Sequence, residues 1–350
     1  MKKKLMMPAV LGAVLLAACQ PVEPEKTEEF GTLTINLANP ALQTKSDVTA
    51  LACESKVNKM RVMIYDSSDK MVLDEFLASP FTSLNIDRIK VGQYSVYAMA
   101  NSCATISSLA GIVQSPEDFN YKAISLSDCS LDENTGFVMF DRNTSVTVTS
   151  GTSSQPVNLS VTRFPARIRL VSVTNSLPIY YGSLTVDHVM IINGYSRWNI
   201  AGHSIPFSPM NEGGRNSTSG EIIATANAAD YPDYSFWEVP SADQTVLQDS
   251  DPKVYNHCFY SFPNQRTTDV TTPAGEGGKM RLVVVAQVLG QVYYYPVTLS
   301  NVERNKSYDV QLTISGLGSD DPNVPVQKGA AGITIGVSDW GDGSNYTETI

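Results

Sequence analysis

The chain has 350 residues, a net charge of -10 and a pI near 4.8, so it repels the phosphate backbone of nucleic acids and nucleic-acid binding is not expected. Charged residues make up only 17% of the chain, while Ser, Thr, Val, Tyr, Gly and Pro recur throughout and long helical periodicity is hard to find. This composition predicts an all-β protein, and its length exceeds what one β-sandwich core needs, so two domains are expected.

The N-terminus carries an export signal. Residues 1–18 combine a basic start, a short apolar run and small residues before Cys19, and the run is too short to span a membrane as a helix. The sequence Leu-Ala-Ala-Cys is typical of a lipoprotein box, in which the signal is cut before the cysteine and the Cys19 thiol carries the lipid. Residues 19–30 are a Pro- and Glu-rich tether. We therefore expect a chain held on the outer membrane by lipid and facing outward.

Strand patterns fill residues 31–160, the expected N-terminal domain. "GTLTINLANP" alternates Leu33, Ile35 and Leu37 with polar residues, and "VNKMRVMIYDSSDKMVLDEF" predicts a hairpin that turns at Asp66-Ser67-Ser68-Asp69. "VGQYSVYAMAN" and "SVTVTS" are further strands, and residues 107–128 are expected to form a short helix or a long loop.

Residues 161–350 continue the series as the expected C-terminal domain. Predicted strands lie in "PVNLSVTRFPARIRLVSVT", "SLTVDHVMIINGYSRWNI", "KMRLVVVAQVLG", "QVYYYPVTL" and "NKSYDVQLTISGLG", and residues 201–251 are expected to be long surface loops. After a linker rich in Gly, Pro and Asp, residues 332–340 form a last predicted strand with Ile333, Ile335 and Val337 on one face.

No segment indicates catalysis, a cofactor or a metal site. His188, His203 and His257 are too scattered for a zinc motif, and His257 and Cys258 are neighbours that point to opposite faces of a strand. The Asp- and Asn-rich turns match no twelve-residue calcium loop. We expect Trp198, Trp237 and the tyrosines of "VYYYPV" to serve mostly in packing, although exposed rings could stack on sugars. Of the cysteines beyond Cys19, three fall in the first half of the chain and Cys258 in the second, so the disulfide pairing stays open.

Four segments together resemble a known family. In chain order they are "VGQYSVYAMAN", "PVNLSVTRFPARIRL", "LSNVERNKSYDVQLTISGLGSDDPNVPV" and "ITIGVSDW", and they are similar to the fimbrillins of Bacteroidales, the subunits of type V pili. The similarity covers Gly31 to Trp340 and is most specific from Arg304 to Pro325. It implies two transthyretin-like Greek-key β-sandwich domains, export as a lipoprotein, and assembly in which a surface protease removes the first strand and the last strand of another subunit takes its place.

The first and last predicted strands carry the same pattern. "LTINL" (33–37) and "ITIGV" (333–337) superimpose, with apolar residues at alternate positions and Thr34 and Thr334 in the same slot. One groove could therefore accept either strand, because an incoming strand both pairs the free backbone and covers the apolar trench. The alternative is that the last strand completes the C-terminal sandwich of its own chain.

Processing departs from the family pattern, which is a cut after arginine in the loop that follows the first strand. No arginine precedes Arg61, and the basic residue of the corresponding loop is Lys45, so the candidate cut lies between Lys45 and Ser46. A chain that is not cut there would keep its lipid and act as the anchor at the base of a pilus.

Two functions follow as expectations. The first is a structural subunit of a cell-surface pilus, with other pilin subunits as its partners. The second is a lipid-anchored pilus anchor or a monomeric adhesin that binds a host glycan or protein, with residues 201–251 as its candidate binding loops.

Overall fold

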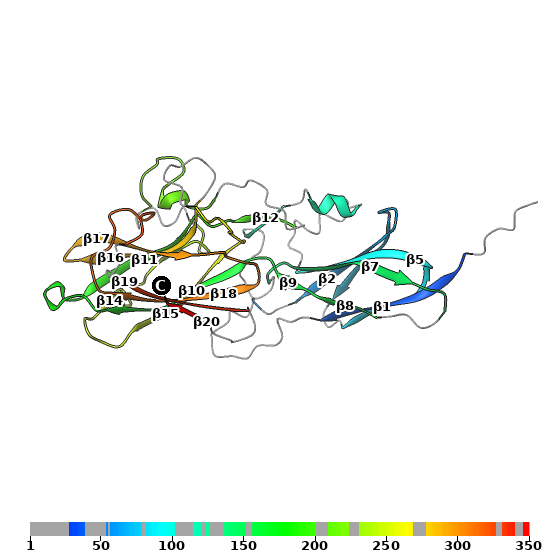
Figure 1. The fold of residues 1–350 in the computed structure, drawn as a ribbon, viewed down its shortest axis with the longest axis horizontal. Helices are drawn as coiled ribbons and strands as arrows, with labels where there is room; N and C mark the ends of the chain where they lie inside the picture. The colour runs from blue at the N-terminus through cyan, green and yellow to red at the C-terminus, as the bar shows by residue number, and fades with distance from the viewer. Residues whose placement is uncertain are drawn as a thin grey trace, which may run out of the picture.

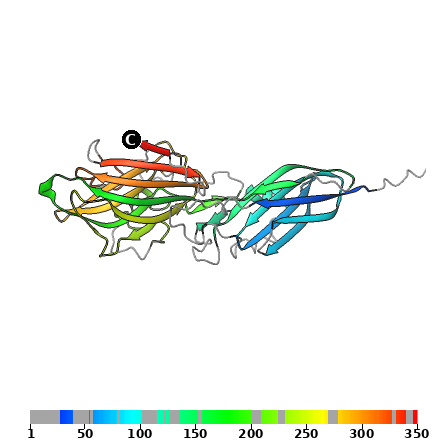
Figure 2. The same cartoon turned by 90° about the horizontal axis from the view of Figure 1, so that it is seen from below.

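The computed structural model describes residues 28–38, 54, 57–78, 82–101, 115–120, 123–126, 136–151, 156–200, 209–223, 231–268, 278–326, 331–339 and 346–349. Its named elements are β-strands and short 3-10 helices, the latter being η3 (Pro116–Asn120), η5 (Ile179–Tyr181) and η6 (Glu212–Gly214). The expected all-β sandwich fold is confirmed. The strands form two groups that lie end to end along the long axis (Figures 1 and 2).

The N-terminal group packs two sheets face to face. One sheet has the order β3-β2-β5-β7-β9 and the other the order β4-β1-β8. The strands are β1 (Phe30–Ala38), β2 (Lys59–Asp66), β3 (Met71–Ala78), β4 (Ser83–Lys90), β5 (Gly92–Ala100), β7 (Met139–Val148), β8 (Val157–Ser160) and β9 (Thr162–Arg163). Alternate residues of both sheets meet in one apolar core, in which Val62 and Val96 from the first sheet face Ile35 and Leu159 from the second.

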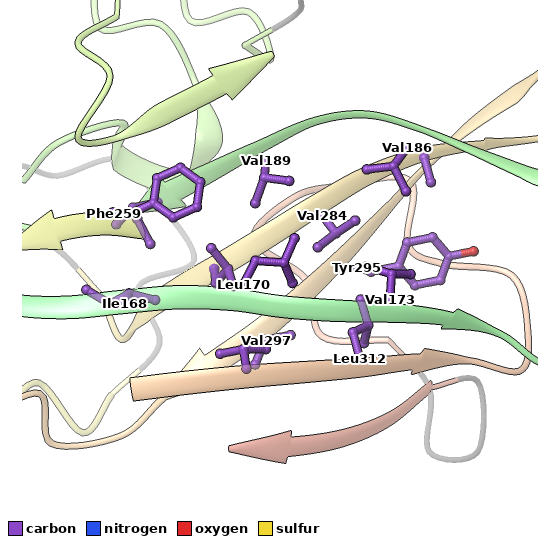
Figure 3. Close-up of a cluster of buried hydrophobic side chains, with 14 of the residues drawn as sticks. Ile168, Leu170, Val173, Val186, Val189, Phe259, Val284, Tyr295, Val297 and Leu312 are labelled. Atoms are coloured by element: carbon purple, nitrogen blue, oxygen red, sulfur yellow. The ribbon is translucent and has the colours of Figure 1, made fainter. Parts of the chain in front are cut away.

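The C-terminal group is a larger sandwich. Its sheets have the orders β15-β10-β18-β19-β20 and β13-β11-β16-β17, and β14 also pairs with β11. The strands are β10 (Ala166–Asn175), β11 (Leu184–Ile192), β13 (Phe236–Glu238), β14 (Thr245–Val246), β15 (Lys253–Ser261), β16 (Met280–Val288), β17 (Gln291–Leu299), β18 (Lys306–Ile314), β19 (Ala331–Asp339) and β20 (Tyr346–Thr349). Figure 3 shows the branched and aromatic side chains, among them Leu170, Val284 and Phe259, that fill the space between the two sheets.

The chain crosses from one group to the other between Arg163, whose strand pairs with β7, and Ala166, where β10 begins. The exact division into domains at residues 160 and 161 stays a prediction. A two-stranded sheet, β6 (Ala123–Ser125) with β12 (Arg197–Asn199), links the two groups a second time. A separate apolar cluster lies there, in which Phe119 of η3 stacks on Tyr97 of β5 at 4.9 Å between ring centroids.

The structure can be compared with what the sequence predicted for two irregular segments, residues 107–128 and 201–251. Of the short helix or long loop expected over 107–128, the described part contains a short helix, η3, which spans Pro116–Asn120. The expectation of surface loops across 201–251 was wrong for part of that region, because Ile223 and Phe236 bury their side chains against the outer face of β11 and β16. The polar composition of the region did not indicate that it covers this face, since only a few of its apolar residues reach the core.

Candidate strand-exchange site

The first strand lies in the middle of its sheet. β1 pairs antiparallel with β4, where Ile35 is opposite Leu84, and parallel with β8, where Ile35 is opposite Val157. Both edges of β1 are therefore hydrogen-bonded, and loss of this strand would leave β4 and β8 each with an unpaired edge.

The apolar face of β1 is buried as the alternating pattern predicts. The side chains of Leu33, Ile35 and Leu37 all lie in the core of the N-terminal group, and Ile35 has no exposed surface. Each such side chain contributes about 1.5–3 kcal/mol when it is fully buried. The opposite face is polar, and there the Asn36 side-chain amide donates a hydrogen bond to Asn158 Oδ1 at 2.9 Å. Removing β1 would thus open an apolar trench between two free strand edges.

The start of β1 is very closely packed. A Cβ atom on Gly31 would lie 2.1 Å from the backbone oxygen of Thr149 and 2.9 Å from Val148 Cγ1. Glycine is therefore required where β1 passes over the end of β7. Any strand that replaces β1 must avoid a side chain at this point.

The last strand lies at the other end of the sequence and in the other group. β19 pairs antiparallel with β18 over nine residue pairs, from Lys306 opposite Asp339 to Ile314 opposite Ala331, and β20 pairs with four residues on its other edge. Ile335 is buried, while Ile333 and Val337 are half-buried against the same core. In this chain the last strand thus completes its own sheet, which is the alternative that the sequence left open.

β1 and β19 are not held equally. Three apolar side chains of β1 are buried, against one of β19, and β1 has two sheet neighbours within the same well-packed core. Backbone pairing does not distinguish the two strands, because each has one long neighbour and a second neighbour that pairs with four of its residues. Because hydrophobic stabilisation grows with buried area, β19 can leave its sheet at a lower free-energy cost than β1 can.

The candidate lipidation and processing residues, Cys19, Lys45 and Ser46, lie outside the described residues, as do His203 and the cysteines of the first half. The roles assigned to Cys19, Lys45 and Ser46 stay predictions. In the part of the chain that the structure describes, no helix is both long and apolar enough to cross a membrane.

The His257-Cys258 pair is not arranged for catalysis. The His257 ring stacks on Trp237 at 4.2 Å, whereas Cys258 packs on the opposite side of β15 against the cluster between the two groups. Burial raises the pKa of the Cys258 thiol to about 12 and lowers the pKa of His257 to about 4. The thiol therefore stays protonated at neutral pH and is a poor nucleophile.

Other residues considered for binding serve in packing. His188 stacks on Phe236 with 4.9 Å between ring centroids, and Trp198 and Trp237 each pack against an apolar cluster. Over the described ranges, no three His, Cys, Asp or Glu side chains lie together as metal ligands would.

One buried polar cluster was not predicted from the sequence. The Glu54 carboxylate accepts hydrogen bonds from Arg167 at 2.7 Å and from the Tyr260 hydroxyl at 2.7 Å, and Arg163 Nε donates to the Glu54 backbone oxygen at 2.5 Å. Glu54 is almost fully buried and precedes β2, whereas Arg167 and Tyr260 belong to β10 and β15. The partners are more than one hundred residues away in the sequence, so no local pattern could have indicated them.

The comparisons with known proteins point to one family and one fold. The profile of the family described as Major fimbrial subunit protein (FimA) matches residues 31–182. No curated protein matches the chain. Among solved structures, the fimbrilin (FimA) of Porphyromonas gingivalis W83 is 14% identical, with a TM-score of 0.60 over 89% of this chain and 98% of that one.

Two further structures have the same fold. A cell adhesion protein candidate from Bacteroides eggerthii DSM 20697 is 20% identical, with a TM-score of 0.64 over 89% of this chain and 97% of that one. The tip fimbrial protein Mfa3 of Porphyromonas gingivalis is 12% identical, with a TM-score of 0.52 over 89% of this chain and 100% of that one. At these identities the similarity establishes the fold alone.

Proposed function

We propose that the chain is a structural subunit of a cell-surface pilus and contributes to adhesion, because the profile of the major fimbrial subunit family matches its residues 31–182. In this proposal the lipid on Cys19 holds the newly exported chain on the outer membrane. A protease then cuts between Lys45 and Ser46, and β1 leaves with the lipid. The β19 strand of another subunit fills the vacant slot, which links the two subunits into a fimbrium.

The position of β1 carries this proposal. It is a central strand whose loss exposes an apolar trench and two unpaired edges, so the cut chain gains free energy by accepting a strand with the same pattern. β19 has that pattern and is less firmly held in its own sheet.

The alignment of residues 333–337 with residues 33–37 also defines how much of β19 can enter the slot left by β1. If Ile335 takes the place of Ile35, then Ala331 falls at the place of Gly31, where a Cβ atom would meet the Thr149 backbone oxygen at 2.1 Å. Ala331 therefore stays outside, and the inserted segment begins at Gly332. The outward positions also match, since Thr334 then lies opposite Asn85 of β4, as Thr34 does in the uncut chain.

A disulfide trap tests the proposal. Cysteines replace Thr334 and Asn85 in the full-length chain made in cells, both on the solvent side of the slot, and pili are sheared from the cells and run without reductant. We expect a ladder of covalent oligomers, because directly opposite strand positions lie within disulfide reach. Thr334→Cys with Gln93→Cys is the matched control, since Gln93 is exposed on β5 away from the slot. Equal ladders in both variants, or none in either, would contradict strand exchange at β1.

The N-terminus of the sheared protein distinguishes the subunit from the anchor. The seated β19 supports the monomeric adhesin, which donates no strand. Mass measurement of the sheared and membrane fractions decides between the two roles. A terminus at Ser46 in the sheared fraction supports the subunit, and an acylated Cys19 on all of the material supports an anchor or adhesin.

A further inference from the structure

The far end of the C-terminal group is apolar and exposed. Four segments meet there, because Asn175 at the end of β10 pairs with Ile314 and lies beside Gln248, while Thr185 at the start of β11 pairs with Gln287. This end lies farthest from the N-terminal group, at the left in Figures 1 and 2. We call the following exposed residues the C-terminal pole: Ile179, Tyr180, Leu247, Leu289, Val292 and Leu317.

Most of the exposed large apolar side chains of the C-terminal group lie at the pole. Ile179 is 81% exposed and Tyr180 is 71% exposed, and among the described residues of the C-terminal group the large apolar side chains exposed elsewhere are Val254 and Val324. The four segments of the pole, residues 176–183, 244–248, 288–292 and 315–319, contain no charged residue, and the acidic residues Asp243, Asp249 and Asp320 border two of them. A patch of exposed aromatic and aliphatic side chains with charged residues at its rim is typical of a protein interface.

The pole is preformed. The Gln248 side chain donates a hydrogen bond to the Leu177 backbone oxygen at 2.7 Å, and the Tyr295 hydroxyl donates to the Gly316 oxygen at 3.2 Å. The first bond joins two of the segments to each other, and the second fixes a third segment to the buried Tyr295. A surface that is already ordered loses little conformational entropy when a partner binds.

Contact with a partner explains Leu289 better than the requirements of the turn in which it lies. It occupies, with Gly290, the two-residue turn between β16 and β17, and both have positive φ, 51° and 77°. Such a turn favours Asn-Gly, and a leucine in the left-handed region is strained. A strained, 69% exposed leucine at this position has no structural benefit to the single chain.

The direction of the strands identifies the partner, and this step rests on the proposed strand exchange. β19 begins at Ala331, opposite Ile314 and hence at the pole, so a donated strand leaves the subunit there. β1 begins at the outer end of the N-terminal group, where Phe30 lies opposite Lys90, and a replacement strand with the same direction enters at that end. The pole of the donor must then face the outer end of the acceptor, where Val91 is exposed.

We propose that the C-terminal pole is the surface on which a second copy of this chain packs, through the outer end of its N-terminal group near Val91. Strand exchange and pole contact together then form one head-to-tail interface.

Substitution of Leu289 separates this role from a structural one. Leu289→Asn suits the turn better, so we expect the isolated chain to melt at the same or a higher temperature while the yield of sheared polymer falls about tenfold, as for loss of an interface anchor. Tyr180→Asp should lower the polymer yield similarly. Val324→Asp is the control and should leave the yield unchanged. Val324 is 52% exposed and follows Asn323, which accepts a hydrogen bond from Arg281 near the start of β16, at the opposite end of that strand from Leu289.

Site-specific crosslinking tests the partner directly. A photoreactive amino acid at position 180 in the full-length chain should give a dimer whose linked peptide contains Val91, and one at position 324 should not. Normal polymer yield in Leu289→Asn and Tyr180→Asp, together with a normal Thr334-Asn85 disulfide ladder, would overturn the pole contact and leave strand exchange standing. Absence of the ladder itself would overturn both.

Discussion

At the scale of single residues, Gly31 has the most demanding position at the strand-exchange site. Gly31→Ala should destabilise the uncut chain by about 1–3 kcal/mol, because its Cβ atom would overlap the backbone of Thr149 and force β1 away from β7. Gly92→Ala is the control, since the nearest atom to its Cβ would be the Tyr94 ring at 3.7 Å. Denaturant unfolding of the uncut chain measures both. An equal effect of the two substitutions would show that the contact at Gly31 relaxes freely.

Two buried histidines predict how stability depends on pH. Burial lowers the pKa of His188, an effect that the nearby Asp187 partly opposes, and burial lowers the pKa of His257; both values fall to about 4. Because the unfolded chain binds these protons near pH 6.5 and the folded chain does not, the unfolded state gains protons as the pH falls from 6.5 to 4. The free energy of unfolding should therefore fall by up to about 1.4 kcal/mol per pH unit for each histidine in this window.

Replacing the histidines tests that slope. The double variant His188→Leu and His257→Leu should show a flatter pH dependence between pH 6.5 and 4, whatever its stability at pH 7. Unfolding by urea at half-unit pH intervals gives the slope. An unchanged slope would mean that the two rings are already protonated in the folded chain.

At the scale of strands, removal of residues 332–350 distinguishes a loosely held strand from an integral one. The deletion takes away one buried isoleucine and one of the two strands that pair with β18, so we expect the monomer to stay folded with its stability lowered by about 2–5 kcal/mol, and polymer to be lost. Circular dichroism of the purified monomer and the yield of sheared polymer measure the two effects. A monomer that no longer folds would make β19 an integral strand and remove it as a donor.

Several strands, and the faces they bury, could be predicted from local pattern. The alternation of Leu33, Ile35 and Leu37 predicted both β1 and its buried face, and "VGQYSVYAMAN" predicted the strand β5, whose Tyr94 and Val96 lie in the core. β1 keeps a strict period of two, which is the property that places side chains on alternate faces of a strand. β5 alternates only around Tyr94 and Val96, because both of its faces are buried further along the strand.

The strand β4 could not be predicted in the same way. Leu84 and Ile86 alternate, but the next core residue is Ile89, because the register with β1 shifts by an irregularity between Gly31 and Leu33. A bulge of this kind interrupts the period of two. The sequence of β1 thus predicted its buried face, whereas the neighbouring strand β4 could not be predicted from its own sequence.

At the scale of the whole molecule, Glu54 connects the start of the N-terminal group to the C-terminal group. Its carboxylate is bound by Arg167 and Tyr260, and the proposed cut after Lys45 leaves it in the mature chain. The cluster therefore survives the loss of β1 and keeps the two groups aligned while the slot is open. A rigid subunit of this kind holds the slot and the C-terminal pole at a fixed separation, which a regular polymer requires.

Breaking the cluster should uncouple the two groups. Glu54→Ala leaves the buried Arg167 guanidinium without this carboxylate, so we expect a loss of about 3–5 kcal/mol and, in calorimetry, one unfolding transition replaced by two. Glu54→Leu with Arg167→Met should recover much of the stability, because an apolar pair carries no buried charge. Lys90→Met breaks the exposed pair with Glu28 and should change little. A single, unshifted transition in Glu54→Ala would mean that the apolar cluster around Phe119 holds the two groups together without the ion pair, and the rigidity of the subunit would then come from packing alone.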